Sequence, residues 1–298
     1  MRKIAVLAML FVVLGSVVAL AGDNPNAAKT PKYIWVQIEQ FEAAKQAPYM
    51  KLGQAFKEAM ANTEYTWLAA MPVAGNGNEV TYVMFPDNFA FVEKAMTAFM
   101  KLGGEMQQKN AALSAEGMAA VEHSRSFIAE SQPELSTVSD KLTPAQTTAW
   151  KVTTFQVKPG GRFEFADFLK EIGAMHQKAG DHVPSYVYSV IAGEPSPAFI
   201  VVTPLKTLAD LDEPPSPAFQ ALMTPLVRDH MVRTVKNTIS AFSTTIYMVD
   251  PRLSLPPKSY VAENPGFWVV KEPAPVAAPG KKAKKAAEPA ATKEKEKK

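Results

Sequence analysis

The chain has 298 residues, 47% of them hydrophobic, and a formal net charge of +3. This length suits one or two globular domains. The absence of cysteine excludes disulfides, thiol nucleophiles and thiolate metal sites. Residues 1–21 carry +2 and residues 281–298 carry +5, so the remaining body has a net charge of −4. A mildly acidic body without a basic face argues against nucleic-acid binding.

The N-terminus has the three parts of a secretory signal. Arg2 and Lys3 are positive, residues 4–20 are mostly apolar, and small residues stand at Ala19 and Ala21. This pattern predicts cleavage of a 1–21 signal peptide and an exported protein, periplasmic or extracellular. The alternative is an uncleaved membrane anchor, although the apolar segment is slightly shorter than the ~20 residues that span a bilayer. No membrane span is predicted after signal removal.

Residues 31–130 are predicted to form a first α/β unit. Alternating apolar residues predict strands, whereas the spacing of Leu52, Ala55, Phe56 and Ala59 predicts a helix. The Gly and Asn residues of 74–78 predict a turn between the two central strands. The expected elements are strand 33–40, helix 48–61, strands 65–71 and 79–85, a helical segment 88–118 interrupted at Gly103-Gly104, and strand 123–129.

Residues 131–147 are rich in Ser, Thr and Pro and are predicted to be a linker. A second unit is expected over residues 148–254, with the same order of elements. These are strand 150–157, helix 163–178, strands 186–191 and 198–203, a short helix 207–212, a long helix 217–236 and strand 241–249.

Two further segments follow the second unit. Residues 255–272 are predicted to be a C-terminal extension, in which Phe267–Val270 adds an edge strand or docks against the body. Residues 273–298 are rich in Ala, Pro and Lys and are predicted to be a disordered tail. We expect this tail to be solvated, and weak contact with an anionic surface is the alternative.

The two units are predicted to be copies of one repeat. Ala74-Gly75 precedes Pro86 by the same distance as Ala192-Gly193 precedes Pro204, and the offset between the copies is 118. The same offset carries the segment 133–136 (Pro-Glu-Leu-Ser) onto 251–254 (Pro-Arg-Leu-Ser). Several matches in one order favour duplication over chance.

The order β-α-β-β-α-β in each copy is that of the ferredoxin-like unit. Helices cover one face of such a sheet, and packing two sheets together buries the open faces. With its strand exit at Pro204–Leu211, the chain resembles the dimeric α/β-barrel superfamily, which includes antibiotic-biosynthesis-monooxygenase-like, NIPSNAP-like and chlorite-dismutase-like proteins. The resemblance implies an α+β fold of two tandem ferredoxin-like units, packed sheet to sheet as an intramolecular pseudo-dimeric barrel. It transfers no catalytic residues.

Strand alternation predicts which side chains lie between the two sheets. We expect Ile34, Val36 and Ile38 to face the helices. The side chains expected between the sheets form a candidate ligand site, namely Trp35, Gln37, Glu39, His123, Arg125 and Lys151. Such a cluster suits a small polar or anionic ligand or a general base. The alternative is an ion-pair network at the barrel mouth without a ligand.

The remaining histidines predict no further site. His176, His182 and His230 do not match the spacing of metal ligands. A helix histidine ligates iron in haem-using relatives, but His230 stands outside any such motif, and we predict no cofactor. Three functions remain open. We favour a non-enzymatic module that binds a small molecule or a protein. The alternatives are a cofactor-independent monooxygenase-like enzyme, which rests on the resemblance, and a structural or interaction protein of the cell envelope.

Overall fold

A closed barrel of eight antiparallel strands forms the centre of the protein. The computed structural model describes residues 30–138, 141–181 and 183–270, so the predicted signal peptide and tail lie outside the described residues. The strands follow the order β1-β3-β2-β8-β5-β7-β6-β4 around the barrel. Within the described residues, no helix has the length and apolar character needed to cross a membrane.

The first half of the chain supplies four strands and three helices. The alternation in Tyr33–Phe41 makes β1, and the turn around Gly75, which has a positive φ of 101°, joins β2 and β3. The elements are β1 (Tyr33–Phe41), α1 (Gln46–Met60), β2 (Leu68–Pro72), β3 (Glu79–Met84), α2 (Phe89–Lys109), α3 (Ala111–Met118) and β4 (Val121–Ser131).

The second half repeats this order and ends in two short helices. Its elements are β5 (Ala149–Val157), α4 (Arg162–Ala179), β6 (Tyr186–Ala192), β7 (Ala198–Leu205), α5 (Pro217–Leu222), α6 (Pro225–Thr238), β8 (Ile239–Val249), α7 (Lys258–Glu263) and α8 (Pro265–Trp268). Short 3₁₀ turns lie at Ala43–Lys45, Pro133–Leu135, Pro144–Gln146 and Leu208–Leu211.

The two halves have the same spatial order of strands, β4-β1-β3-β2 and β8-β5-β7-β6. Their edges also pair with each other. β2 pairs with β8, where Ala70 lies opposite Val249, and β4 pairs with β6, where Ala129 lies opposite Val190. The sheets are therefore joined by hydrogen bonds at both edges in addition to packing face to face. Closure gives every strand of the described barrel two neighbours, which removes exposed edges.

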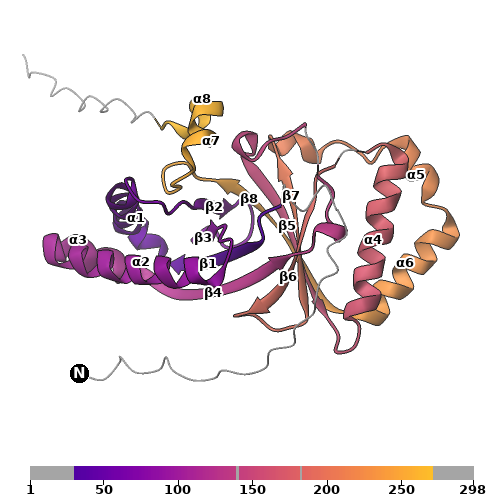
Figure 1. Cartoon of the computed structure of the whole chain (residues 1–298), viewed down its shortest axis with the longest axis horizontal. Coiled ribbons are helices and arrows are strands. Elements are labelled where there is room, and N and C mark those ends of the chain that lie inside the picture. The colour runs from indigo at the N-terminus through magenta and orange to yellow at the C-terminus, as the bar shows by residue number, and fades with distance from the viewer. Residues whose placement is uncertain (1–29, 139–140, 182, 271–298) are drawn as a thin grey trace, which may run out of the picture.

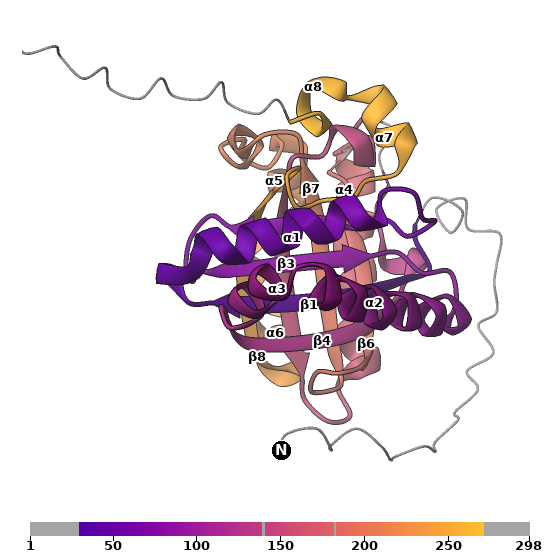
Figure 2. The same ribbon diagram turned by 90° about the vertical axis from the view of Figure 1, so that its left-hand side faces the viewer.

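Helices cover the barrel on two opposite sides. Figure 1 shows α1, α2 and α3 on one side and α4, α5 and α6 on the other. Figure 2 shows α1, α2 and α3 crossing in front of β1, β3 and β4. Inside the barrel a separate core of small aliphatic side chains includes Ile34, Val36, Ile38, Val190 and Ile200. Each strand of the barrel therefore has two faces to bury, one toward the helices and one toward the interior.

Two helix boundaries differ from the sequence prediction. The break in the segment 88–118 falls at Asn110, whose side chain accepts a hydrogen bond from the Leu113 amide, whereas Gly103 and Gly104 stay helical. The long helix predicted at 217–236 is divided before Pro225, because the side chain of Thr224 caps a new helix. In both cases a capping side chain sets the boundary.

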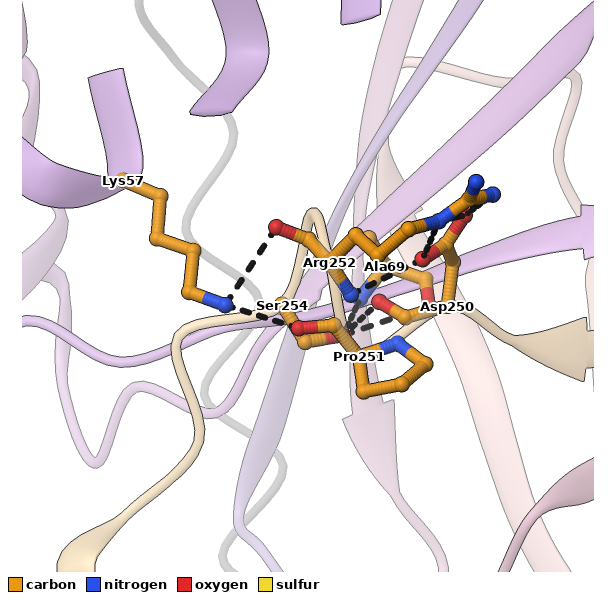
Figure 3. A network of polar contacts seen from close by, with 6 residues as sticks. All are labelled: Lys57, Ala69, Asp250, Pro251, Arg252 and Ser254. Carbon is orange, nitrogen blue, oxygen red and sulfur yellow. Dashed lines mark hydrogen bonds and ion pairs between the residues drawn. The ribbon is translucent and has the colours of Figure 1, made fainter. Parts of the chain in front are cut away.

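A turn after β8 is fastened to the first half of the chain. Asp250 forms an ion pair with Arg252, with 2.5 Å between Oδ2 and Nη2. The buried hydroxyl of Ser254 accepts from the Ala69 amide at 2.8 Å and donates to the Asp250 carbonyl at 2.7 Å. Lys57 of α1 donates to the Pro251 carbonyl at 2.7 Å, and Figure 3 shows this network. The turn thus holds the end of β8 against β2 and α1.

The C-terminal extension packs against one end of the barrel. Of the two alternatives for Phe267–Val270, no edge strand forms there, and Phe267 and Trp268 dock through α8, whereas Val269 and Val270 are exposed. Trp268 is buried against Leu68 and Val249, and its indole N–H donates to the Ala145 carbonyl at 2.9 Å. Figures 1 and 2 both show α7 and α8 at the top of the barrel. We call residues 255–268 the C-terminal cap.

Candidate functional site

The barrel encloses a cavity of about 380 Å³. This volume lies at the lower end of the range for small-molecule sites. Most of its wall is aliphatic or aromatic and comes from both halves of the chain. The apolar lining comprises Ile34, Val36, Ile38, Leu68, Val83, Phe85, Phe127, Trp150, Val152, Val190, Ala198, Ile200 and Val202, together with the aromatic rings of Tyr186, Tyr188, Tyr247 and Tyr260.

One part of the wall carries charge. Arg125 on β4 and Glu194 in the β6–β7 turn form an ion pair through Nη1 and Oε1. They are the two charged residues among the described side chains that line the cavity. The Arg125 side chain is 58% exposed and that of Glu194 26%. This exposure indicates that the ion pair lies where the cavity meets solvent.

Hydroxyl groups lie near the ion pair. Thr81 on β3 and Arg125 on β4 both pair with Ile38 of β1, from opposite sides, so the three residues form one row across the interior. Tyr247 also lines the cavity, and its hydroxyl donates a long hydrogen bond of 3.5 Å to Glu79. Burial raises the pKa of Tyr247, and the nearby Arg125 partly offsets this rise.

The hydroxyl of Thr81 is buried without a hydrogen-bond partner at bonding distance among the described residues. The phenol of Tyr247 is a polar neighbour, since a side-chain interaction with Thr81 contributes to lowering the pKa of that phenol. Buried hydroxyls normally have a partner, because desolvation without a replacement bond costs about 1–3 kcal/mol. Thr81 therefore offers a donor and an acceptor to a polar atom of a bound molecule.

Segments outside the strands complete the cavity wall near Trp150. Pro144 and Thr147, from the segment between the halves, and Tyr260 of the C-terminal cap all line it beside Trp150. The cap therefore contributes directly to the cavity wall. The cavity is polar and open near Arg125 and aromatic near Trp150 and Tyr260.

Of the six residues predicted for the site, all within the described part of the chain, Arg125 alone lines the cavity. The strand phase predicted for β1 is wrong. Trp35 stacks on Phe99 of α2, and Glu39 accepts from the Tyr49 hydroxyl of α1, so both face the helices. Gln37 donates to Ser124 on the same outer face. Ile34, Val36 and Ile38, which were expected against the helices, lie inside the barrel.

The predicted phase of β5 is also wrong, because Trp150 and Val152 line the cavity and the intervening Lys151 is exposed on the outer face. The physical reason is the same in both strands. Apolar side chains are found both inside a closed barrel and where its strands meet the helices. Alternation therefore shows that a strand has two faces, but it does not show which face points into the barrel. On β4 the phase agrees with the prediction, since Arg125 and Phe127 point inward.

His123 lies on β4 opposite Gln40, two residues before Arg125, and is exposed. It does not line the cavity. The structure therefore does not bring the predicted Glu39, His123 and Arg125 together. Whether any of these residues binds a ligand stays a prediction.

Glu39 instead belongs to a buried polar cluster beneath α1. The Tyr49 hydroxyl lies 2.8 Å from Glu39 Oε2 and 3.0 Å from the Tyr82 hydroxyl. Burial raises the pKa of the Glu39 carboxyl, and its hydrogen bonds with Tyr49 and Gln37 offset part of the rise. Burial likewise raises the pKa of Tyr49 and Tyr82. The cluster is closely packed against Leu253 and Phe41 and serves as a core contact.

The other histidines in the described residues make local contacts. His176 lies 3.4 Å from Asp181, and His230 lies 3.0 Å from Glu171 across α4 and α6. His182 lies outside the described residues. The described part of the chain contains no group of three or more His, Asp or Glu side chains that could hold a metal ion.

Sequence reasoning did not find Thr81, Glu194, Tyr247 or the contribution of Tyr260 to the cavity wall. Glu194 follows Gly193 in the β6–β7 turn, and a carboxylate in a turn is too common to indicate a binding site. Tyr260 sits in a segment with no strand or helix periodicity of its own. The available signal was the inward phase of β4, which identified Arg125 and could have directed attention to the turn beside it.

No protein-family model matches the chain, and no curated protein matches it in sequence. Several solved structures resemble it in shape. An anthrone oxidase-like protein shares 16% identity, covering 75% of this chain and 93% of its own, with a TM-score of 0.47. A Fusobacterium nucleatum protein, provisionally described as a monooxygenase, shares 14% over 74% of this chain and 93% of its own, with a TM-score of 0.48. Chlorite dismutase from Candidatus Nitrospira defluvii, in complex with imidazole, shares 8% identity, covering 81% of this chain and 99% of its own, with a TM-score of 0.43. With TM-scores below 0.5, these likenesses assign neither a family nor an activity to the chain.

Proposed function

We propose that this chain is an exported, non-enzymatic binding protein that holds a small, largely apolar molecule inside its barrel. The observation that carries the proposal is the cavity of about 380 Å³ with aliphatic and aromatic walls. A packed barrel of this size normally fills its interior with side chains, whereas lining a cavity with apolar groups creates a place for an apolar ligand.

Ligand binding can be tested with the neutral dye N-phenyl-1-naphthylamine, whose fluorescence rises in apolar surroundings. We expect saturable binding of one dye per chain. Val202→Trp fills the cavity from β7 and should weaken binding by at least about tenfold, a loss of ~1.4 kcal/mol. Val73→Trp, on an exposed turn, is the matched control. Absence of saturable binding, or equal binding by the Val202 variant with an unchanged circular dichroism spectrum, would reject the proposal.

Duplication and export belong to the same proposal. Duplication is supported by the common strand order of the halves and by positive φ angles at both Gly75 and Gly193, which are 118 residues apart. The finer description, two ferredoxin-like units forming an intramolecular pseudo-dimer, follows from it. Export is supported by the sequence of residues 1–21. N-terminal sequencing of the protein from the envelope fraction should begin at Gly22, and an intact Met1 would contradict cleavage.

A cofactor-independent monooxygenase-like enzyme is the second candidate. The observation that favours it is the Glu194 carboxylate at the cavity edge, paired with Arg125, since a carboxylate could remove a proton from a bound carbon acid. Oxygen uptake with a phenolic substrate, lost in Glu194→Gln, would support the enzyme. Dye binding without oxygen uptake would support the binding protein.

A further inference from the structure

We propose that the barrel ligand is an amphipathic carboxylate, whose carboxylate group pairs with Arg125 and whose apolar body extends toward Trp150. This inference rests on the proposed binding function and names the chemical class that the same cavity would take. It is carried by Arg125 and Glu194, the two charged side chains among the described residues of a wall that is mostly apolar.

One positive charge faces the cavity. Arg125 is the one cation among the described residues that line it. A guanidinium has five N–H donors in a planar fork and keeps its charge at all ordinary pH values. Glu194 contacts it through Nη1. The remaining donors suit a second carboxylate, which a guanidinium binds in a two-pronged arrangement.

The barrel holds Arg125 more firmly than it holds Glu194. Arg125 lies within the β1–β4 ladder, directly opposite Ile38, so its backbone position is set by the barrel. Glu194 lies in the turn between β6 and β7, next to Gly193 with its positive φ. Turn residues move at lower cost than residues in a ladder. Glu194 therefore acts as a tethered carboxylate that occupies Arg125 when no ligand is bound and can exchange with one.

The apolar part of the wall limits the shape of the ligand. Phe127, Val36 and Val152 line the same cavity as Arg125 and Trp150 and offer no side-chain hydrogen bond, whereas the polar side chains of Thr154, Gln156, Ser243 and Thr245 on other strands carry no charge. A molecule that is polar along its whole length would lose hydration there without compensation. The buried Thr81 hydroxyl, which has no partner at bonding distance among the described residues and has Tyr247 as a polar neighbour, adds one hydrogen-bonding point in the same row as Arg125. One charged end and an apolar body fit this distribution.

A cationic ligand fits the same wall less well. An amine could pair with Glu194, but it would then lie beside the Arg125 guanidinium, and like charges at short range oppose each other. A multiply charged anion would place more charge in the apolar interior than one guanidinium compensates. The wall therefore favours one negative charge.

The test compares three molecules that share an apolar body, namely 2-naphthylacetic acid, its methyl ester and 2-(2-naphthyl)ethylamine. Each competes with N-phenyl-1-naphthylamine for the full-length protein. We expect the acid to bind at least about tenfold more tightly than the ester. Arg125→Gln should remove this preference. Glu194→Gln should strengthen acid binding severalfold, because the competing carboxylate is gone. Lys151→Gln, which removes a cation from the outer face of β5, should change nothing.

The outcomes distinguish failure of the carboxylate inference from failure of the proposed binding function. If the dye binds but the acid has no advantage over the ester, or if Arg125→Gln leaves the advantage intact, the carboxylate inference is overturned while cavity binding stands. Preferential binding of the amine would also overturn it, in favour of a cation at Glu194. If neither the dye nor any of the three molecules binds, the proposed function itself fails. The side chains of Arg125 and Glu194 are both partly exposed, so we expect both variants to fold, and thermal melting of each variant checks this.

Discussion

Glu39 shows how a single carboxyl group can link stability to pH. Burial raises its folded-state pKa above the ordinary value of 4.5, so folding favours the protonated form. The folded protein then binds more protons than the unfolded chain once the pH exceeds about 4.5. The contribution of Glu39 to the free energy of unfolding therefore falls as the pH rises from about 4.5 through the folded pKa, and this contribution is constant above that value.

Glu39→Gln should weaken this pH dependence. The amide cannot ionise, and its oxygen can still accept the hydrogen bond from Tyr49. We expect a smaller loss of unfolding free energy between pH 4.5 and pH 7 in the variant than in the unchanged protein, measured by urea denaturation. Glu42→Gln is the control, because Glu42 forms a surface ion pair with Lys45. Identical pH profiles for the Glu39 variant and the unchanged protein would show that this carboxyl does not control the effect.

The two hairpin turns of the barrel differ in their surroundings. Gly75 has φ of 101°, and a Cβ built on it would meet nothing within 4 Å. Gly193, in the equivalent turn, has φ of 93°, and its Cβ would lie 2.2 Å from the Ser126 carbonyl oxygen and 2.7 Å from the Phe127 Cα. The β6–β7 turn therefore lies directly on the backbone of β4, beside the seam that closes the barrel.

Comparing alanine substitutions at the two glycines separates the cost of a positive φ from the cost of contact with β4. Gly75→Ala should cost about 1–2 kcal/mol of unfolding free energy, because a positive φ is unfavourable for a residue with a Cβ. Gly193→Ala should cost at least ~1 kcal/mol more, since the β4 backbone must also move. Chemical denaturation of both variants measures the difference. Equal losses would mean that the turn can lift from β4 without penalty.

At the scale of the whole molecule, the C-terminal cap joins the two halves. Trp268 is 4% exposed and packs with Leu68 of β2 and Val249 of β8, while its N–H is held by the Ala145 carbonyl of the segment between the halves. Tyr260 extends from the same cap into the cavity wall. The cap is thus part of the fold and part of the site.

Trp268→Ala should affect both stability and binding. Removing a buried Trp costs about 3–5 kcal/mol, and here it also leaves the Ala145 carbonyl without this donor. We expect a lower melting temperature together with faster dissociation of N-phenyl-1-naphthylamine in stopped-flow measurements. Val269→Ala, at a position 53% exposed, should change neither. A destabilised variant with unchanged dissociation would show that the cap does not limit release of the dye.

Local sequence patterns were sufficient to predict the strands. All eight strands overlap the segments that alternation and turn residues predict, because the alternation of side chains can be read within one segment. The boundaries at Asn110 and Thr224 were missed although a capping signal was present in each case. Phe267–Val270 was left open between strand and docking, because its partners, Leu68 and Ala145, are distant in the chain.

The sequence was enough to predict a mixed α/β fold, an inward-facing Arg125 and an acidic body with a basic C-terminal segment. Long-range packing selected which face of β1 and β5 points inward, and so excluded Trp35, Glu39 and Lys151 from the cavity. Alternation has a period of two, and both faces of a barrel strand are buried, so the two orientations look alike along the chain. The pairing of Arg125 with Glu194 and the closure by Tyr260 also arise between segments far apart in sequence, where no local pattern records them.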